Sequence, residues 1–190
     1  KMVLASRSDE RGSAHVSFRV ALINPPARNA GEIGQKCFPP LNLLNLVSAL
    51  EQAGIPVLLL DANALALSHQ ELVTRLRRFQ PSLIGSSLYT DILAPVHRML
   101  LALEAALPDA RFILGGPHAS ALPSQVLASY PMVDFVLRGE AELSLPRLCN
   151  NLQQRQDLAE VPGLSFRRDG QTVHNEQAPH LQDVDSLGGP

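Results

Sequence analysis

Short polar groups follow several apolar runs of this chain, at the points where buried strands would end. The set is rich in hydroxyls and amides, and it carries charge only at its edges. Hydroxyls and amides hold neutral ligands by hydrogen bonds, and glycines let a flat group lie against the backbone. These groups therefore favour a large, mostly apolar ligand with amide edges over a bare phosphate. They are Asn24; Asp61 and Asn63; Ser86, Ser87, Tyr89 and Thr90; Gly115, Gly116 and His118; and Arg138, Gly139 and Glu140.

The turn after the first apolar run lacks the motifs that bind phosphate. It consists of Asn24-Pro25-Pro26, where a P-loop requires GxxxxGK[ST] and a flavodoxin has a Ser/Thr-rich loop. Gly31 and Gly34 give only GxxG, well after the run. The run also ends without the acidic residues that hold a metal in receiver domains. A nucleotide or small-molecule enzyme on this fold is therefore the weakest of the functional hypotheses.

Apolar runs and helical spacing alternate from Phe18 onward, which predicts five parallel strands separated by helices. Right-handed crossovers and the strand order 2-1-3-4-5 predict an α/β, flavodoxin-like (Rossmann-like) fold, with a ligand site at the carboxyl ends of the first and third strands. A C-terminal β-hairpin is expected around the turn Asp169-Gly170. We expect strands at 18–24, 57–60, 83–87, 111–114 and 133–137, helices at 41–53, 68–79, 91–107, 122–130 and 140–154, and the hairpin at 163–173.

The composition is that of an ordinary globular domain: 190 residues, 45% hydrophobic and 18% charged. A net charge of −2 and an aromatic content of 4% give no reason to expect nucleic acid or a membrane as a partner. No apolar run approaches the roughly 18 residues of a membrane span. The two cysteines, Cys37 and Cys149, form no CxxC pair, which favours a reducing, cytoplasmic compartment.

Four segments together resemble the cobalamin-binding domain of cobalamin-dependent radical SAM enzymes. The ending of the chain is similar to the hairpin and connector that lead into the catalytic barrel of that family. The resemblance extends over residues 18–190 and implies that the domain holds cobalamin with its nucleotide tail in the carboxyl edge of the sheet. The four segments are Asn24-Pro-Pro26, Phe38-Pro-Pro-Leu-Asn-Leu-Leu44, Ile84-Gly-Ser-Ser-Leu-Tyr-Thr90, and Gly115-Gly-Pro-His118 with Val133-Asp-Phe-Val-Leu-Arg-Gly-Glu-Ala-Glu142; the ending is Pro162-Gly-Leu-Ser-Phe166 with Asp183-Val-Asp-Ser-Leu187.

The resemblance also implies which residues surround the cobalamin tail. The serine of the third strand is Ser87, with Ser86 as the competing register, and the double glycine of the fourth strand is Gly115-Gly116. A buried hydroxyl can hydrogen-bond an amide or a ring nitrogen, and the glycines admit a planar base. The full set of implied cofactor-binding residues is Asn24, Pro25, Asp61, Asn63, Ser86, Ser87, Leu88, Tyr89, Thr90, Gly115, Gly116, His118, Arg138, Gly139 and Glu140.

The chain departs from the family pattern at two places. Related cobalamin domains carry Asp-x-His-x-x-Gly after the second strand, and the histidine coordinates cobalt. Here residues 61–66 have Asn63 in place of the histidine and Ala66 in place of the glycine. Because an amide nitrogen is a poor metal ligand, the resemblance implies base-off cobalamin with no histidine on cobalt and with the loop at 63–67 below it.

The second departure is the absence of the CxxxCxxC run that holds a [4Fe–4S] cluster. Cys37 and Cys149 cannot supply it. The cluster and S-adenosylmethionine are therefore expected only in a catalytic domain absent from this chain. We expect a disordered leader at 1–17, the cobalamin-binding domain at 18–157, and a hairpin and linker toward the absent domain at 158–190. The linker-like ending, Gly188-Gly-Pro190, favours a fragment.

The sequence therefore predicts the cobalamin-binding part of a radical SAM enzyme, with methyl transfer favoured, although the family also includes cyclases and ring-contracting enzymes. No catalytic residue and no protein ligand to the metal is predicted in this chain. The alternative is a flavodoxin-like interaction or small-molecule-binding domain that does not bind cobalamin. Each residue also has an ordinary interpretation, such as a strand end for Ser87, a tight turn for Gly115-Gly116 or a first-turn acid for Glu140. Their joint occurrence at one sheet edge is what favours the functional interpretation.

Overall fold

The computed structural model describes residues 18–26 and 39–177. One sheet runs through this part of the chain, in the strand order β2-β1-β3-β4-β5-β6-β7. The first five strands are parallel, and the last two are antiparallel. The predicted α/β class and the order 2-1-3-4-5 are confirmed, and the predicted hairpin continues the same sheet. The strands are β1 (Val20–Asn24), β2 (Val57–Asp61), β3 (Leu83–Ser87), β4 (Arg111–Gly115), β5 (Phe135–Leu137), β6 (Leu164–Arg168) and β7 (Gln171–His174).

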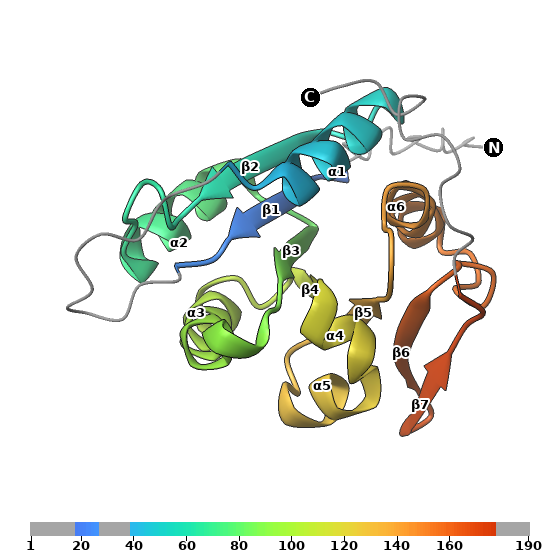
Figure 1. Cartoon of the computed structure of the whole chain (residues 1–190). Helices are drawn as coiled ribbons and strands as arrows, with labels where there is room; N and C mark the ends of the chain where they lie inside the picture. The colour runs from blue at the N-terminus through green and yellow to red at the C-terminus, as the bar shows by residue number, and fades with distance from the viewer. Residues whose placement is uncertain (1–17, 27–38, 178–190) are drawn as a thin grey trace, which may run out of the picture.

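Helices cover both faces of the sheet (Figure 1). One face carries α1 (Leu41–Gln52) and α6 (Ser144–Gln154), and we call it the α1–α6 face. The opposite face carries α2 (His69–Phe79), the 3-10 turn η1 (Thr90–Ile92) with α3 (Leu93–Ala106), α4 (Pro117–Ala121) and α5 (Pro123–Ser129). None of the helices in the described ranges is long and apolar enough to cross a membrane. The predicted leader at 1–17, the residues after 177 and Cys37 lie outside these ranges.

The alternation of side chains along each strand decides which residues reach which face. On β3, Leu83 packs in the core under α1 and α6, whereas Ile84 packs in the core on the opposite face. Gly85 and Ser87 therefore face the same side as Leu83. Ser86 faces the same side as Ile84. This alternation places Ser86 and Ser87 on opposite faces of the sheet.

Local signals explain where the helices begin, and two of them were misjudged from the sequence. A capping box begins α2, since the Ser68 hydroxyl accepts the Glu71 N–H at 3.2 Å and a Glu71 carboxylate oxygen accepts the Ser68 N–H at 2.9 Å. Helix α6 begins at Ser144, not at 140 as predicted, because Gly139 takes a φ of +73° and a turn follows it. Glu140 is therefore not a first-turn acid. The short helix α4 was not predicted, although Pro117 at its first position needs no hydrogen-bond partner for its nitrogen.

Asp134 links the starts of β4 and β5, and it gives the fold a dependence on pH. Its carboxylate accepts the Phe112 N–H at 2.8 Å. Burial raises the pKa of Asp134. That hydrogen bond and the charges of Arg111 and Arg167 lower this pKa, but by less than burial raises it. A pKa above the unfolded value means that the folded state binds more protons, so this group favours folding more as the pH falls through the folded pKa.

We therefore expect Asp134→Asn to be more stable than the natural chain at neutral pH. The amide oxygen can still accept the Phe112 N–H, and the buried charge is removed. Urea denaturation at neutral and mildly acidic pH measures the difference. The advantage of the variant should shrink in acid, and an advantage that grows in acid would contradict the expectation.

Candidate functional site

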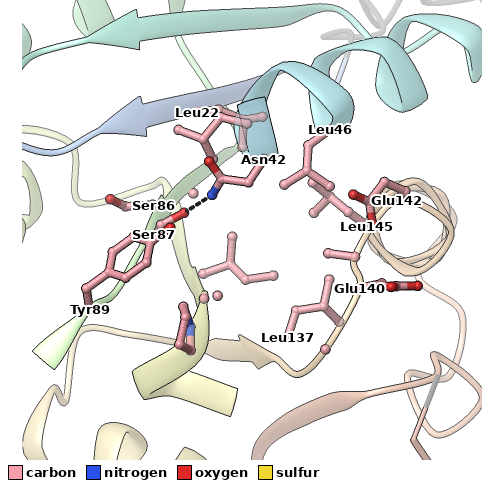
Figure 2. A pocket seen from close by; sticks show the side chains of 18 residues that line it. Leu22, Asn42, Leu46, Ser86, Ser87, Tyr89, Leu137, Glu140, Glu142 and Leu145 are labelled. Carbon is pink, nitrogen blue, oxygen red and sulfur yellow. Dashed lines mark hydrogen bonds between the residues drawn. The ribbon is translucent and has the colours of Figure 1, made fainter. Parts of the chain in front are cut away.

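A pocket of about 320 Å³ opens at the carboxyl edge of the sheet, between the strands and the helices of the α1–α6 face (Figure 2). Residues of β3 and β4 form its floor, and polar groups lie at Asn42, Ser87, Glu140 and Glu142. A mostly apolar cavity with a few polar groups suits an organic ring-bearing ligand. The apolar walls come from four elements and the floor: Leu22, Leu43, Leu46, Ile113, Leu137 and Leu145.

Two glycines on the pocket floor serve different purposes. A Cβ on Gly85 would lie 2.9 Å from Leu22 Cδ2 and 3.3 Å from Ile113 Cγ2, so this glycine lets core side chains pack. A Cβ on Gly115 would meet only the carbonyl oxygen of Leu137, at an ordinary 3.6 Å. The space that Gly115 leaves is therefore open to a ligand.

The two serines of β3 make different hydrogen bonds. The Ser86 hydroxyl donates to the carbonyl oxygen of Ile23 at 3.0 Å. The Ser87 hydroxyl accepts the side-chain amide of Asn42 at 2.8 Å, across the pocket wall from α1. Ser87 also pairs in register with Gly115 on β4. Of the two registers left open by the sequence, the structure therefore directs the hydroxyl of Ser87 to the pocket and engages that of Ser86 elsewhere.

A comparison with known families identifies the family of the chain. The family model described as "B12 binding domain" matches residues 32–149, which is more than half of the chain. The chain belongs to the B12 binding domain family. The predicted recognition and the predicted cofactor, cobalamin, are thereby confirmed at the level of the family.

The relatives of this B12 binding domain are longer proteins. The anaerobic magnesium-protoporphyrin IX monomethyl ester cyclase of Synechocystis sp. is 36% identical over 171 residues, 88% of this chain and 34% of the cyclase. The cytidylyl-2-hydroxyethylphosphonate methyltransferase of Streptomyces wedmorensis is 28% identical over 185 residues, 87% of this chain and 34% of that enzyme. The chain thus spans about a third of the length of these curated relatives.

A solved structure supports the fold. The cobalamin-dependent S-adenosylmethionine radical enzyme OxsB, with aqua-cobalamin and S-adenosylmethionine bound, superposes with a TM-score of 0.74. The match has 22% sequence identity and covers 87% of this chain and 23% of OxsB. At this identity the likeness concerns the fold of the B12 binding domain alone.

The structure brings part of the predicted binding set to the pocket. The predicted residues that line it come from the ends of β3 and β4 and from the turn after β5. Arg138 is directed away from it, because its guanidinium donates to the carbonyl oxygens of Gly163, at 3.2 Å, and of Asn175. Burial lowers the pKa of Arg138. The predicted residues that line the pocket are Ser86, Ser87, Tyr89, Gly115, Gly116, Gly139 and Glu140.

Other predicted residues lie beside the pocket. Leu88 is fully buried in the core of the opposite face, and its backbone N–H donates to the carbonyl oxygen of Gly115 at 2.8 Å. The Thr90 hydroxyl and His118 Nδ1 are 3.0 Å apart, outside the pocket lining. These residues shape the edge between β3 and β4, and a ligand contact for them stays a prediction.

A second predicted group lies at the ends of β1 and β2. The Asn24 amide donates to an Asp61 carboxylate oxygen at 2.9 Å, and the same oxygen accepts the Ala64 N–H at 2.8 Å. Asp61 therefore holds the loop that carries Asn63. Pro25 is buried beside this group. None of the four predicted residues of this group, Asn24, Pro25, Asp61 and Asn63, lines the pocket.

The same loop contains Ala66 in the left-handed region, with a φ of +49°. An L-residue is disfavoured there by about 1–2 kcal/mol, whereas glycine is not. We expect Ala66→Gly to stabilise the domain by about 0.5–1 kcal/mol, since the relief of strain exceeds the entropy that glycine adds to the unfolded chain. Urea denaturation measures this. A loss of stability would show that the loop relaxes around the alanine at no cost.

The sequence missed two polar residues of the pocket, Asn42 and Glu142. Both stand in the segments that carry the family resemblance, but neither follows a strand directly. Asn42 could have been noticed as an amide one residue before the buried Leu43 of α1. The signal for Glu142 was weaker, because it was expected to lie within a helix.

Two further observations concern the metal-ligating and sulfur-bearing side chains of the described residues. No group of three or more His, Cys, Asp or Glu side chains there could hold a metal ion. Cys149 is free and buried in the core under α6, and burial raises the pKa of its thiol to about 12. Its thiol is therefore protonated at neutral pH.

Proposed function

We propose that this domain binds cobalamin base-off, with the nucleotide tail in the pocket and with no histidine of this chain on cobalt. The observation that carries the proposal is the open floor at Gly115, next to the hydroxyl of Ser87. A planar base can lie against a surface without a side chain and hydrogen-bond one polar group at its margin, and these two residues provide both.

The other pocket residues fit the same group. Aliphatic side chains such as Leu46 and Leu145 wall the cavity, which suits an aromatic ring. One carboxylate oxygen of Glu142 is buried and has no hydrogen-bond partner in the described part of the chain. Such an atom calls for a donor, and the amide N–H groups and ribose hydroxyls of cobalamin are donors.

The base-off part of the proposal rests on the loop after β2. Asn63 stands where related domains have a histidine, and Asp61 anchors the loop through Asn24 and Ala64. An amide side chain does not replace imidazole as a cobalt ligand. When bound, cobalamin supplies a cobalt ion that can carry a methyl group and pass it on. The pocket residues of this chain would hold the tail, and the loop at Asn63 would offer the cobalt ion no imidazole.

We further propose that the complete protein joins this domain to a radical SAM catalytic domain in the cytoplasm and transfers a methyl group. The similarity to a methyltransferase supports this reaction. Cyclisation is the second candidate, supported by the 36% identity to a cyclase. Full-length protein supplied with S-adenosylmethionine labelled in its methyl group would separate them, because only methyl transfer leaves the label in the product.

Spectroscopy of the isolated chain tests the binding. Hydroxocobalamin is added under reducing conditions, free cofactor is removed by gel filtration, and the visible spectrum of the protein fraction is recorded. We expect about one cobalamin per chain with a base-off spectrum. Quantitative recovery of free cobalamin would instead favour an interaction domain without this cofactor. A retained base-on spectrum would contradict the placement of the tail.

A further inference from the structure

A second cavity, of about 370 Å³, lies at the amino edge of the sheet, and none of its residues lines the pocket at Gly115. It is formed mainly by the first residues of β4 and β5, by Asp134 before β5, and by the last residues of β6, which runs antiparallel to β5. Three arginines but only one aspartate line it. The cavity therefore carries a surplus of positive charge.

Two of the arginines, Arg111 and Arg168, are held over aromatic rings. The guanidinium carbon of Arg111 lies 5.9 Å from the centroid of the Phe135 ring, and that of Arg168 lies 5.2 Å from the centroid of the Phe166 ring. A guanidinium over a ring keeps its N–H groups for other partners. Both rings belong to the core of the α1–α6 face, and β5 separates the two strands that carry the arginines. Two guanidinium groups thus approach one cavity from strands on either side of β5.

These two guanidinium groups have hydrogen-bond donors to spare. Arg111 is exposed and forms no hydrogen bond or salt bridge with another described residue, so the N–H groups of its fork are available. The Arg168 guanidinium donates to an Asp157 carboxylate oxygen at 2.6 Å through one nitrogen. The third arginine, Arg167, donates instead to three backbone carbonyl oxygens of the segment 127–133. Arg167 therefore holds that segment and adds only charge to the cavity.

We propose that this cavity binds the diphosphate group of a small molecule. A diphosphate carries terminal oxygens on two phosphorus atoms, so one group can accept hydrogen bonds from Arg111 on one side and from Arg168 on the other. A carboxylate presents its two oxygens in one direction and satisfies a single guanidinium fork. The one acidic residue of the lining, Asp134, is already engaged, because its carboxylate accepts the Phe112 N–H at 2.8 Å. The site is separate from the cobalamin pocket, so the inference goes beyond the proposed function.

Calorimetric titration of the 190-residue chain with sodium pyrophosphate tests this site. We expect saturable binding of one pyrophosphate per chain. The dissociation constant should rise about tenfold in Arg111→Gln and in Arg168→Gln, because each variant loses charge-assisted hydrogen bonds. Arg98→Gln is the matched control, since it removes the same charge from an exposed arginine of α3 outside the cavity lining, and it should leave the dissociation constant unchanged. Circular dichroism confirms that each variant is folded.

Three results would overturn the inference. The first is a natural chain that binds no pyrophosphate at millimolar concentration. The second is an Arg98→Gln variant that loses as much affinity as Arg111→Gln, because only the net charge of the chain would then attract the anion. The third is a natural chain that binds citrate, whose charge lies on carboxylates, as tightly as pyrophosphate. None of these measurements uses cobalamin, so the proposed function stands or fails independently of them.

Discussion

Replacing Gly115 by leucine is expected to abolish the retention of cobalamin while the domain stays folded. The added side chain would occupy the pocket floor, where a Cβ meets only the Leu137 carbonyl oxygen at 3.6 Å. An aromatic base buries about 150 Å², which at about 25 cal/mol per Å² contributes nearly 4 kcal/mol. Its exclusion from the pocket therefore corresponds to a loss of affinity of several hundredfold. Gel filtration with hydroxocobalamin and a titration followed by absorbance measure the loss.

Gly115→Ala provides the graded control for this prediction. One methyl group occupies little of the pocket of about 320 Å³, so the affinity should fall only severalfold. Both variants should unfold within about 0.5 kcal/mol of the natural chain, since Gly115 has no positive φ and its Cβ direction is open. Undiminished binding by the leucine variant would show that the tail does not use this floor.

The neighbouring glycine should behave in the opposite way. Gly116 has φ +89° and ψ 177°, a region that only glycine adopts without strain. A Cβ there would also lie 3.1 Å from the carbonyl oxygen and 3.2 Å from the nitrogen of Leu88. We expect Gly116→Ala to lower the free energy of unfolding by about 2–3 kcal/mol, as measured by urea denaturation.

The two alanine variants together form a direct comparison. Gly115→Ala should affect binding with little change in stability, and Gly116→Ala should lower stability. Equal stabilities of the two variants would refute the distinct reasons given for the two glycines. Gly115 and Gly116, which form one motif in the sequence, would then share a single role.

The order of strands and helices could be predicted from the sequence, because the strands stand out as short apolar runs. The aliphatic runs at 57–60 and 83–87 end at polar residues, and the connecting helices have helical spacing, so the order of elements followed. The side of the sheet on which a residue lies needs the register of neighbouring strands. For this reason Ser86 and Ser87 could not be separated from the sequence alone. Their separation follows from the packing of Leu83 and Ile84.

The pocket itself was predicted in part, and the errors have a common cause. Residues at the end of a strand, such as Gly115 and Ser87, were found. Arg138 directly follows a strand, but its guanidinium reaches the carbonyl oxygens of the hairpin instead. The hydrogen-bond partner of a long side chain depends on the groups that the fold brings near it. The spacing of strands in the sequence does not reveal those groups. Asn42 was overlooked because it reaches the pocket from a helix, across a gap of 45 residues in the sequence.

The hairpin of β6 and β7 has a consequence for how the domain can be joined to anything else. Strand β6 runs against β5, and β7 runs back toward the carboxyl edge, with Arg138 and the backbone of Gly163 tying 175–176 in place. The Gln177 side chain lies within 2.7 Å of the point where Gly139, a pocket residue, would carry a Cβ. The backbone thus leaves the carboxyl edge of the sheet after β5, later passes through the β6–β7 hairpin and returns to the rim of the pocket. The chain that continues after Gln177 is therefore attached at the rim of the pocket.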